Sequence, residues 1–429
     1  MSTDIDPSDL TDCIRCERSS PLKQFFKPTT DGPLCPRCFK EDALHASGRN
    51  IGLFLLGTLL LTLVAIGMHI GNNPLRFLLT NIAAIYPLWI ITQFLYAGIQ
   101  WLVSLLVGGQ LFILNIGYGP KLIETDILGT QLSIGRFQNG VTYRFAPKSS
   151  SRRRLSTSIF YGLPIFIHTL IVIALLPAFD PDTVRNSYAF PLVFLLTSGY
   201  LLYTIAYPNR LSIGGASVNN NAANLLQVIN EQISPTDLQA NYLSYAADRA
   251  LDTRRTIEGL EHTKRGLEIA PKHLMLTLYH GALLEKSGRV DEAIEYLTPA
   301  LDRYLHPSAE RASVLNNLAW YHLTGSGDQA AAFNLAKEAY HLLPWESAIE
   351  STWGSVLIMD EEIDDGLYHL KESLKLSNTS KESQATTLAF MALGYHRKGK
   401  KGKAKEYIQR ALINAPNSHV VKHAQLEIS

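Results

Sequence analysis

Residues 51–70 of this 429-residue chain read IGLFLLGTLLLTLVAIGMHI and contain no Asp, Glu, Lys or Arg. A helix of this length spans about 30 Å, which matches the hydrocarbon thickness of a bilayer. The run begins fifty residues into the chain, and it is too long for the apolar region of a cleaved signal peptide. It therefore predicts a transmembrane helix.

Three further uncharged runs follow, at residues 77–120, 155–179 and 186–209. Core helices of soluble proteins are usually shorter and carry a polar face. We predict a mainly α-helical multi-pass membrane domain at about residues 50–230. Its four helices are expected at about 51–70, 77–107, 157–178 and 187–207.

The basic residues predict the orientation of this membrane domain. The loop after the second predicted span carries Arg152, Arg153 and Arg154, whereas the loop after the third has one arginine and two aspartates. Because basic residues gather in cytoplasmic loops, both termini are predicted to be cytoplasmic.

The charges of the whole chain nearly cancel, with 39 Lys and Arg against 38 Asp and Glu. This balance disfavours a nucleic-acid partner that would bind through bulk positive charge. Charged residues make up only 18% of the chain, below the roughly 25% typical of soluble domains. The composition indicates an uncharged membrane part joined to a charged soluble part.

All four cysteines lie near the N-terminus, as the pairs Cys13/Cys16 and Cys35/Cys38. Two C-x2-C turns can place four thiolates around one tetrahedral Zn2+, so we predict a structural zinc in a ribbon-like domain at residues 1–45. Two disulfides or thioredoxin-like redox chemistry are the alternatives. A cytoplasmic N-terminus disfavours stable disulfides.

The segment 108–122, GGQLFILNIGYGPKL, resembles the stretch that follows the catalytic helix in the site-2 protease family of intramembrane zinc metalloproteases. The similarity extends over about residues 77–227 in the order helix, strands, helix, helix. It implies a small β-hairpin insertion after the second span, and the glycine-punctuated residues 122–145 suit such hairpins.

The family's catalytic residues have no counterpart in this chain. By the family's spacing, the H-E-x-x-H positions fall on Tyr96, Ala97 and Gln100, and the family's aspartate ligand falls on Asn221. A zinc protease needs two imidazoles and a carboxylate base, so the resemblance implies a fold that has lost catalysis. His69 and His168, the imidazoles within the spans, are interpreted as a helix-end residue and a polar helix–helix contact.

Two series of small and large residues recur in the C-terminal part. One runs from Gly281 to Ala300 and the other from Ala392 to Pro416, with looser copies around Ala319 and Gly354. The spacing is that of tetratricopeptide repeats, in which small residues let two antiparallel helices approach. We predict an α-solenoid of four or five helix pairs at residues 235–420.

The concave face of such a solenoid normally binds a peptide or a partner helix. Projection of the repeat pattern onto that face selects six candidate partner-binding residues: Glu285, Lys286, Asn316, Trp320, His396 and Arg397.

The sequence thus predicts a non-catalytic, pseudoprotease-like membrane scaffold that presents cytoplasmic interaction modules to protein or peptide partners. Its core could still hold a client transmembrane helix. The alternatives are an active intramembrane metalloprotease with a non-standard site, or a lipid- or solute-handling membrane protein regulated through its repeats.

Overall fold

The computed structural model describes residues 10–29, 32–70, 75–148, 152–178, 189–208, 210–213, 216–375 and 380–428. The chain is mainly helical and divides into two compact units. One unit contains residues 1–41, 250–267 and 272–429, and the other contains residues 42–249 and 268–271.

The N-terminal segment consists of two short hairpins followed by a long helix. Its elements are β1 (Thr11–Asp12), β2 (Ser19–Ser20), η2 (Lys23–Phe25), β3 (Lys27–Thr29), β4 (Gly32–Leu34) and α1 (Pro36–Ile70). The pairs β1–β2 and β3–β4 are antiparallel. Helix α1 begins inside the second cysteine pair and continues through the first predicted span.

The second unit contains the remaining apolar helices, together with a bent sheet. Its elements are α2 (Arg76–Ala83), α3 (Ile85–Leu106), β5 (Gly109–Ile127), β6 (Thr130–Pro147), α4 (Arg153–Leu175), η3 (Leu176–Ala178), α6 (Phe190–Ala206), β7 (Arg210–Ile213), β8 (Ala216–Asn219), α7 (Asn221–Ile229) and α8 (Pro235–Asp252).

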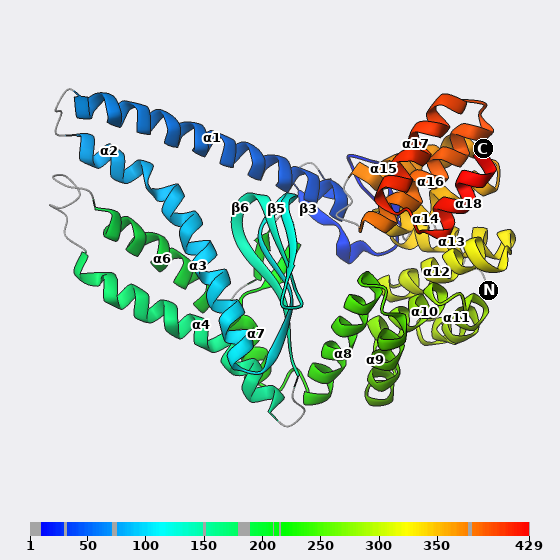
Figure 1. Cartoon of the computed structure of the whole chain (residues 1–429), viewed down its shortest axis with the longest axis horizontal. Coiled ribbons are helices and arrows are strands. Elements are labelled where there is room, and N and C mark those ends of the chain that lie inside the picture. The colour runs from blue at the N-terminus through cyan, green and yellow to red at the C-terminus, as the bar shows by residue number, and fades with distance from the viewer. Residues whose placement is uncertain are drawn as a thin grey trace. The chain divides into compact units, whose positions relative to one another are not determined.

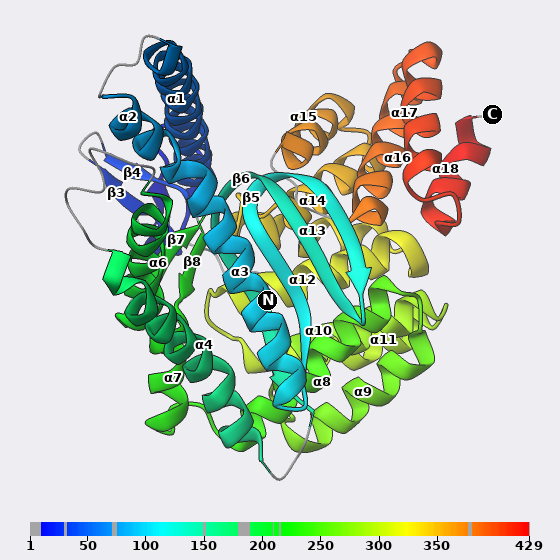
Figure 2. The ribbon, with the colours of Figure 1, turned by 60° about the vertical axis from the view of Figure 1, so that its left-hand side comes forward.

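Helices α3, α4 and α6 pack against one another, as Figure 1 shows. The β5–β6 sheet lies against α3 (Figure 2). Residues 113–116 of β5 pair with two parts of β6, residues 131–134 and 141–144, so the predicted hairpin is larger than expected. A core around Ala97, Leu111 and Phe160 joins α3, the sheet and α4.

Two helices of the described chain are long and apolar enough to cross a membrane, at Arg76–Leu106 and Arg153–Leu175. The apolar stretches Leu59–Ile70 and Phe190–Ala206 are shorter. Part of the predicted fourth span, residues 187–188, lies outside the described residues. The expectation of four spanning helices therefore goes further than this finding.

The first unit contains an array of antiparallel helix pairs. Its helices are α9 (Thr256–Ile269), α10 (Leu274–Lys286), α11 (Val290–Leu297), η4 (Thr298–Arg303), α12 (Ala309–Tyr321), η5 (His322–Ser326), α13 (Gln329–Leu342), α14 (Ser347–Met359), α15 (Ile363–Lys375), α16 (Lys381–Arg397), α17 (Lys401–Asn414) and α18 (His419–Ile428). Four pairs, α10/α11 to α16/α17, follow one another with α18 after them. The predicted solenoid is confirmed for these pairs.

The N-terminal hairpins share a hydrophobic core with the solenoid, and no sequence pattern predicted this. Leu22, Phe26 and Leu34 pack in one cluster with Leu342 and Trp345. The segment 10–41 thus completes the solenoid's unit.

Candidate functional site

The four cysteines are brought together by two tight turns. The first turn, between β1 and β2, contains Cys13 and Cys16, and Cys13 N–H donates to Arg18 O at 3.0 Å. Glu17 has φ +57°, which lets the turn close directly after Cys16. In the second turn, Cys35 lies between the end of β4 at Leu34 and the start of α1 at Pro36, and the first turn of α1 carries Cys38.

The four Sγ atoms lie within 4.8 Å of one another. Cys16 Sγ and Cys35 Sγ are 3.7 Å apart, close to the roughly 3.8 Å edge of a tetrahedron with zinc–sulfur bonds of about 2.3 Å. Cys35 N–H donates to Cys13 Sγ at 3.3 Å, and all four cysteines are free rather than disulfide-bonded. The geometry suits one structural metal ion.

The thiols differ in acidity even without a metal. The hydrogen bond from Cys35 lowers the pKa of Cys16 to about 4, with Arg18 adding to this effect. Burial raises the pKa of Cys38 to about 12, and the hydrogen bond to Cys16 raises that of Cys35 further. A bound cation would displace the protons of the thiols that hold it.

A second cluster forms at the positions that the protease resemblance selects. Tyr96 and Gln100 lie one turn apart on α3, and Asn221 begins α7. Tyr96 OH donates to Asn221 Oδ1 at 2.7 Å, and Gln100 Nε2 donates to Tyr96 OH at 2.9 Å. The three residues, separated by up to 125 positions, thus meet in one buried network.

Two residues that the sequence did not single out complete this network. Tyr143 OH on β6 also donates to Asn221 Oδ1, and Asn221 Nδ2 donates to Tyr161 O at 3.1 Å. The only sequence signal for Tyr143 was its position in the glycine-punctuated stretch 122–145, which suits a β-hairpin. The bonds join α3, β6, α4 and α7 through neutral groups.

The imidazole of His168 lies beside this network. Its ring lies 5.5 Å from that of Tyr96, edge to face, and its Nδ1 pairs with Pro164 O at 3.0 Å. Ala97 is buried in the adjacent core and has no group that can take a proton. Across the described residues, the cysteine cluster is the only set of three or more His, Cys, Asp or Glu ligands close enough to hold a metal.

The six candidate partner-binding residues lie on α10, α12 and α16, the first helices of their pairs. Lys286 Nζ bonds to Glu382 Oε1 at 2.9 Å, and the ring of Trp320 lies 6.1 Å from that of Phe390. Arg397 Nη1 donates to Ile358 O at 2.6 Å. These three residues therefore connect helices within the solenoid.

The other three candidates present buried polar atoms. Glu285 Oε1, Asn316 Oδ1 and His396 Nδ1 have no hydrogen-bond partner among the described residues. His419 Nε2 lies 3.9 Å from Glu285 Oε1. A buried polar atom without a hydrogen-bond partner can bind a polar atom of another protein that docks against it.

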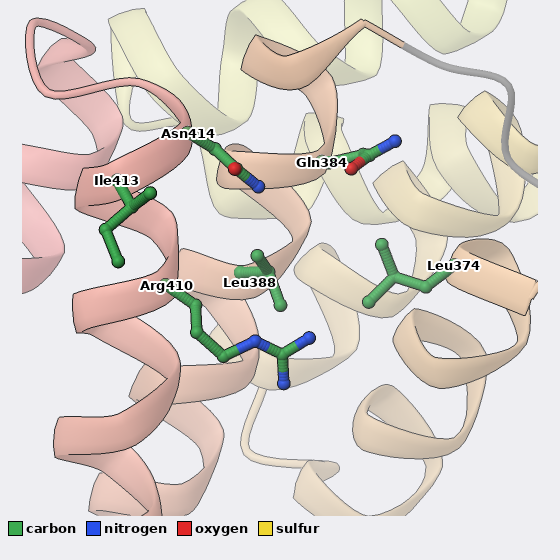
Figure 3. Close-up of a pocket in the computed structure, with 6 residues that line it drawn as sticks. All are labelled: Leu374, Gln384, Leu388, Arg410, Ile413 and Asn414. Carbon is green, nitrogen blue, oxygen red and sulfur yellow. The ribbon is translucent and has the colours of Figure 1, made fainter. Parts of the chain in front are cut away.

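Two cavities show no catalytic pair. A cleft of about 380 Å³ between α15, α16 and α17 is lined by Leu388 and Arg410 among others (Figure 3). A cavity of about 240 Å³ between α3 and the sheet is lined almost wholly by apolar side chains such as Trp101 and Leu114. Neither cavity brings together a nucleophile and a base.

Comparison with known proteins identifies the class of the C-terminal part. Residues 274–344 match the tetratricopeptide-repeat family, which covers α10 to α13. None of the curated proteins matches this sequence.

Several solved structures are similar to the chain. The Cut9–Hcn1 hetero-tetramer of APC/C is 16% identical over 65% of this chain and 49% of that chain, with a TM-score of 0.39. A tetratricopeptide-repeat protein of Thermus thermophilus is 18% identical over 44% and 98%, with a TM-score of 0.35. YrrB, a repeat protein with an unusual peptide-binding site, is 14% identical over 48% and 97%, with a TM-score of 0.29. The chain thus spans about half the length of the chain that it matches in that complex.

Proposed function

We propose that this protein is a non-catalytic membrane scaffold whose apolar helices anchor a tetratricopeptide solenoid for protein or peptide partners. The observation that carries the proposal is the joining, in one chain, of repeat helix pairs to apolar helices with exposed side chains. Repeats of this class typically bind proteins, and an anchored solenoid would gather its partners at a membrane.

The exposure of the apolar helices supports the anchor. Only 33% of the most apolar window in Arg76–Leu106 and 17% of that in Arg153–Leu175 is buried. A core helix of a soluble protein would be mostly covered, and large exposed apolar patches mark surfaces that contact lipid or another protein. Large apolar side chains are exposed on four helices, for example Leu63, Leu102, Phe166 and Leu196.

The proposal includes four spans, with α1 and α6 as the first and last, and both termini on the cytoplasmic side. Alkaline carbonate extraction should leave the protein in the membrane pellet. Protease added outside sealed cells should cleave neither terminus, whereas permeabilised cells should lose both. Release into the carbonate supernatant would contradict the anchor, and cleavage of one terminus in intact cells would contradict the orientation.

The absence of catalysis rests on the neutral network of Tyr96, Gln100 and Asn221. A phenol and two amides supply hydrogen bonds, but they supply neither the imidazole ligands nor the carboxylate base of a zinc protease. We therefore propose that the core keeps a site-2-protease-like arrangement without cleavage, and that it could hold a client transmembrane helix.

The cofactor in this proposal is one Zn2+ held by Cys13, Cys16, Cys35 and Cys38, which fit a tetrahedral site. The purified protein should contain one zinc per chain by elemental analysis. Replacing Cys13 and Cys35 with serine should remove it. Two zinc ions per chain, one of them retained by the double variant, would instead support a metalloprotease with a relocated site.

Partner binding can be tested by crosslinking and mass spectrometry on membranes that contain the full-length chain. Crosslinked partner peptides should map to α10, α12 and α16. Asn316→Ala, which removes a buried acceptor on that face, should lower their yield, whereas Glu346→Gln, at an exposed position, should not. Crosslinks confined to the second unit would contradict a scaffold that acts through its repeats.

A further inference from the structure

The side chains of two arginines in the cysteine turns extend into the solenoid and are buried there. Arg18 follows Cys16 by two residues, and Arg37 lies between Cys35 and Cys38. Their side chains are only 8% and 5% exposed. Both guanidinium groups reach the carboxylate of Glu350 on α14, which is fully buried.

Each carboxylate oxygen of Glu350 receives one arginine. Arg18 Nη2 donates to Oε1 at 2.6 Å, and Arg37 Nη1 donates to Oε2. Arg37 Nη2 also donates to Glu372 on α15, at 2.7 Å to the backbone oxygen and at 3.0 Å to Oε2. We call Glu350 and Glu372 the acidic socket.

Apolar and backbone contacts surround the ion pairs. Ser20 Oγ donates to Leu342 O at 2.7 Å, and the ring of Phe26 meets that of Trp345 edge to face at 5.3 Å. Because these groups are buried together, the contact has the character of a core rather than of a surface ion pair.

The acidic socket depends on the arginines. The imidazole of His369 also lies near Glu350, with its Nδ1 3.6 Å from Oε1. A buried carboxylate that loses its charged partners is strongly destabilising, so an empty socket would rearrange or take up water.

The arginines in turn depend on the cysteine turns. The hairpins that hold them have strands of two or three residues, and Arg18 and Arg37 lie within two residues of a cysteine. A segment this small has little core of its own, so a metal at the four thiolates would fix the backbone of both turns.

We propose that the cysteine module, residues 10–41, is a metal-dependent internal ligand of the solenoid. Metal at the four cysteines holds Arg18 and Arg37 in the acidic socket, and loss of the metal releases the module and opens the socket. This proposal rests on the metal site proposed above. Thermodynamic linkage makes the coupling reciprocal, so docking strengthens metal binding by the factor by which metal strengthens docking.

The coupling can be measured with zinc and full-length protein in detergent. Glu350→Gln removes the charge of the carboxylate that both arginines reach, keeps the shape of that side chain and leaves every cysteine intact. We expect this variant to lose zinc to a competing chelator at least about tenfold more readily than the wild type, and to show faster hydrogen exchange over residues 10–41. Glu346→Gln, at an exposed position at the start of the same helix, is the matched control and should stay within about twofold of the wild type.

A second arm uses the wild type alone and so does not depend on the variant's folding. Chelation should speed exchange in the cysteine module and also in α14 and α15 around the socket, and added zinc should reverse both changes. Equal zinc retention in Glu350→Gln and wild type, or faster exchange confined to residues 10–41 after chelation, would overturn the coupling while leaving the metal site intact. A wild type that binds no zinc would overturn both proposals.

Discussion

At the residue scale, Asn221 occupies the position of a metal ligand in the protease resemblance but acts as a hydrogen-bond acceptor in this structure. The protease resemblance places it where a metal-binding aspartate would lie, and its amide oxygen accepts bonds from Tyr96 and Tyr143. Two phenol donors on one neutral acceptor satisfy buried polar groups without any metal. The sequence could show that the ligands were absent. It could not show that their replacements bond to one another, because that depends on the packing of α3, β6 and α7.

Replacing Asn221 with alanine tests whether this network is structural. The change leaves two buried hydroxyl donors without their acceptor, so it should lower the free energy of unfolding by about 1–3 kcal/mol. Thermal unfolding in detergent measures the effect. The control is Asn224→Ala on the same helix, whose side chain makes only a 3.4 Å bond to Asn219 O. If the two variants lost the same free energy of unfolding, the network would contribute no more to stability than the one long hydrogen bond of Asn224, which would contradict its structural role.

At the element scale, the helix pair α14/α15 shows why small residues recur in the repeats. A Cβ on Gly366 would lie 2.8 Å from Gly354 O, and a Cβ on Gly354 would lie 2.9 Å from Gly366 O. The two backbones therefore touch where the helices cross. The repeat pattern selected Gly354, because helices that approach closely need small residues at regular intervals along the sequence.

Gly366→Ala should therefore destabilise the protein. Forcing a methyl group against backbone typically costs about 1–3 kcal/mol, which exceeds the up to ~1 kcal/mol that alanine gains over glycine in a helix. Gly402→Ala on α17 has open space around it and should be neutral or slightly stabilising. Thermal or denaturant unfolding of the two variants gives the comparison. A Gly366→Ala protein as stable as Gly402→Ala would contradict the crossing.

At the scale of the whole molecule, ion pairs connect distant repeats of the solenoid's unit. Glu382 at the start of α16 pairs with Lys286 of α10 and lies 4.0 Å from Arg254. Burial alone would raise the pKa of Glu382, but the hydrogen bond and charge of Lys286, with the charges of Arg254 and His419, hold it below its ordinary value of 4.5. This charge cluster links the first of the four helix pairs to the last across the face that partners are expected to use.

The depressed pKa fixes the sign of a pH effect. Ionised Glu382 contributes stability that is fully present above its ordinary value and is lost as the pH falls through the lower folded value. The melting temperature of Glu382→Gln should therefore fall below that of the wild type at about pH 7, and the gap should shrink below about pH 4.5. Glu295→Gln, at an exposed position on α11, should differ from the wild type by the same small amount throughout. A gap for Glu382→Gln that widens in acid would contradict the assignment.

The sequence by itself determined the helical class, the repeat pairs, the apolar helices and the grouping of the cysteines. These features depend on the spacing of residues a few positions apart, which determines what one helix face or one turn brings together. The tertiary structure alone decided that Arg18 and Arg37 pair with Glu350, 332 and 313 residues away, and that the cysteine module belongs to the solenoid's core. The physical reason is that the strength of an ion pair depends on burial and geometry, and no local pattern encodes which distant carboxylate will be buried beside which arginine.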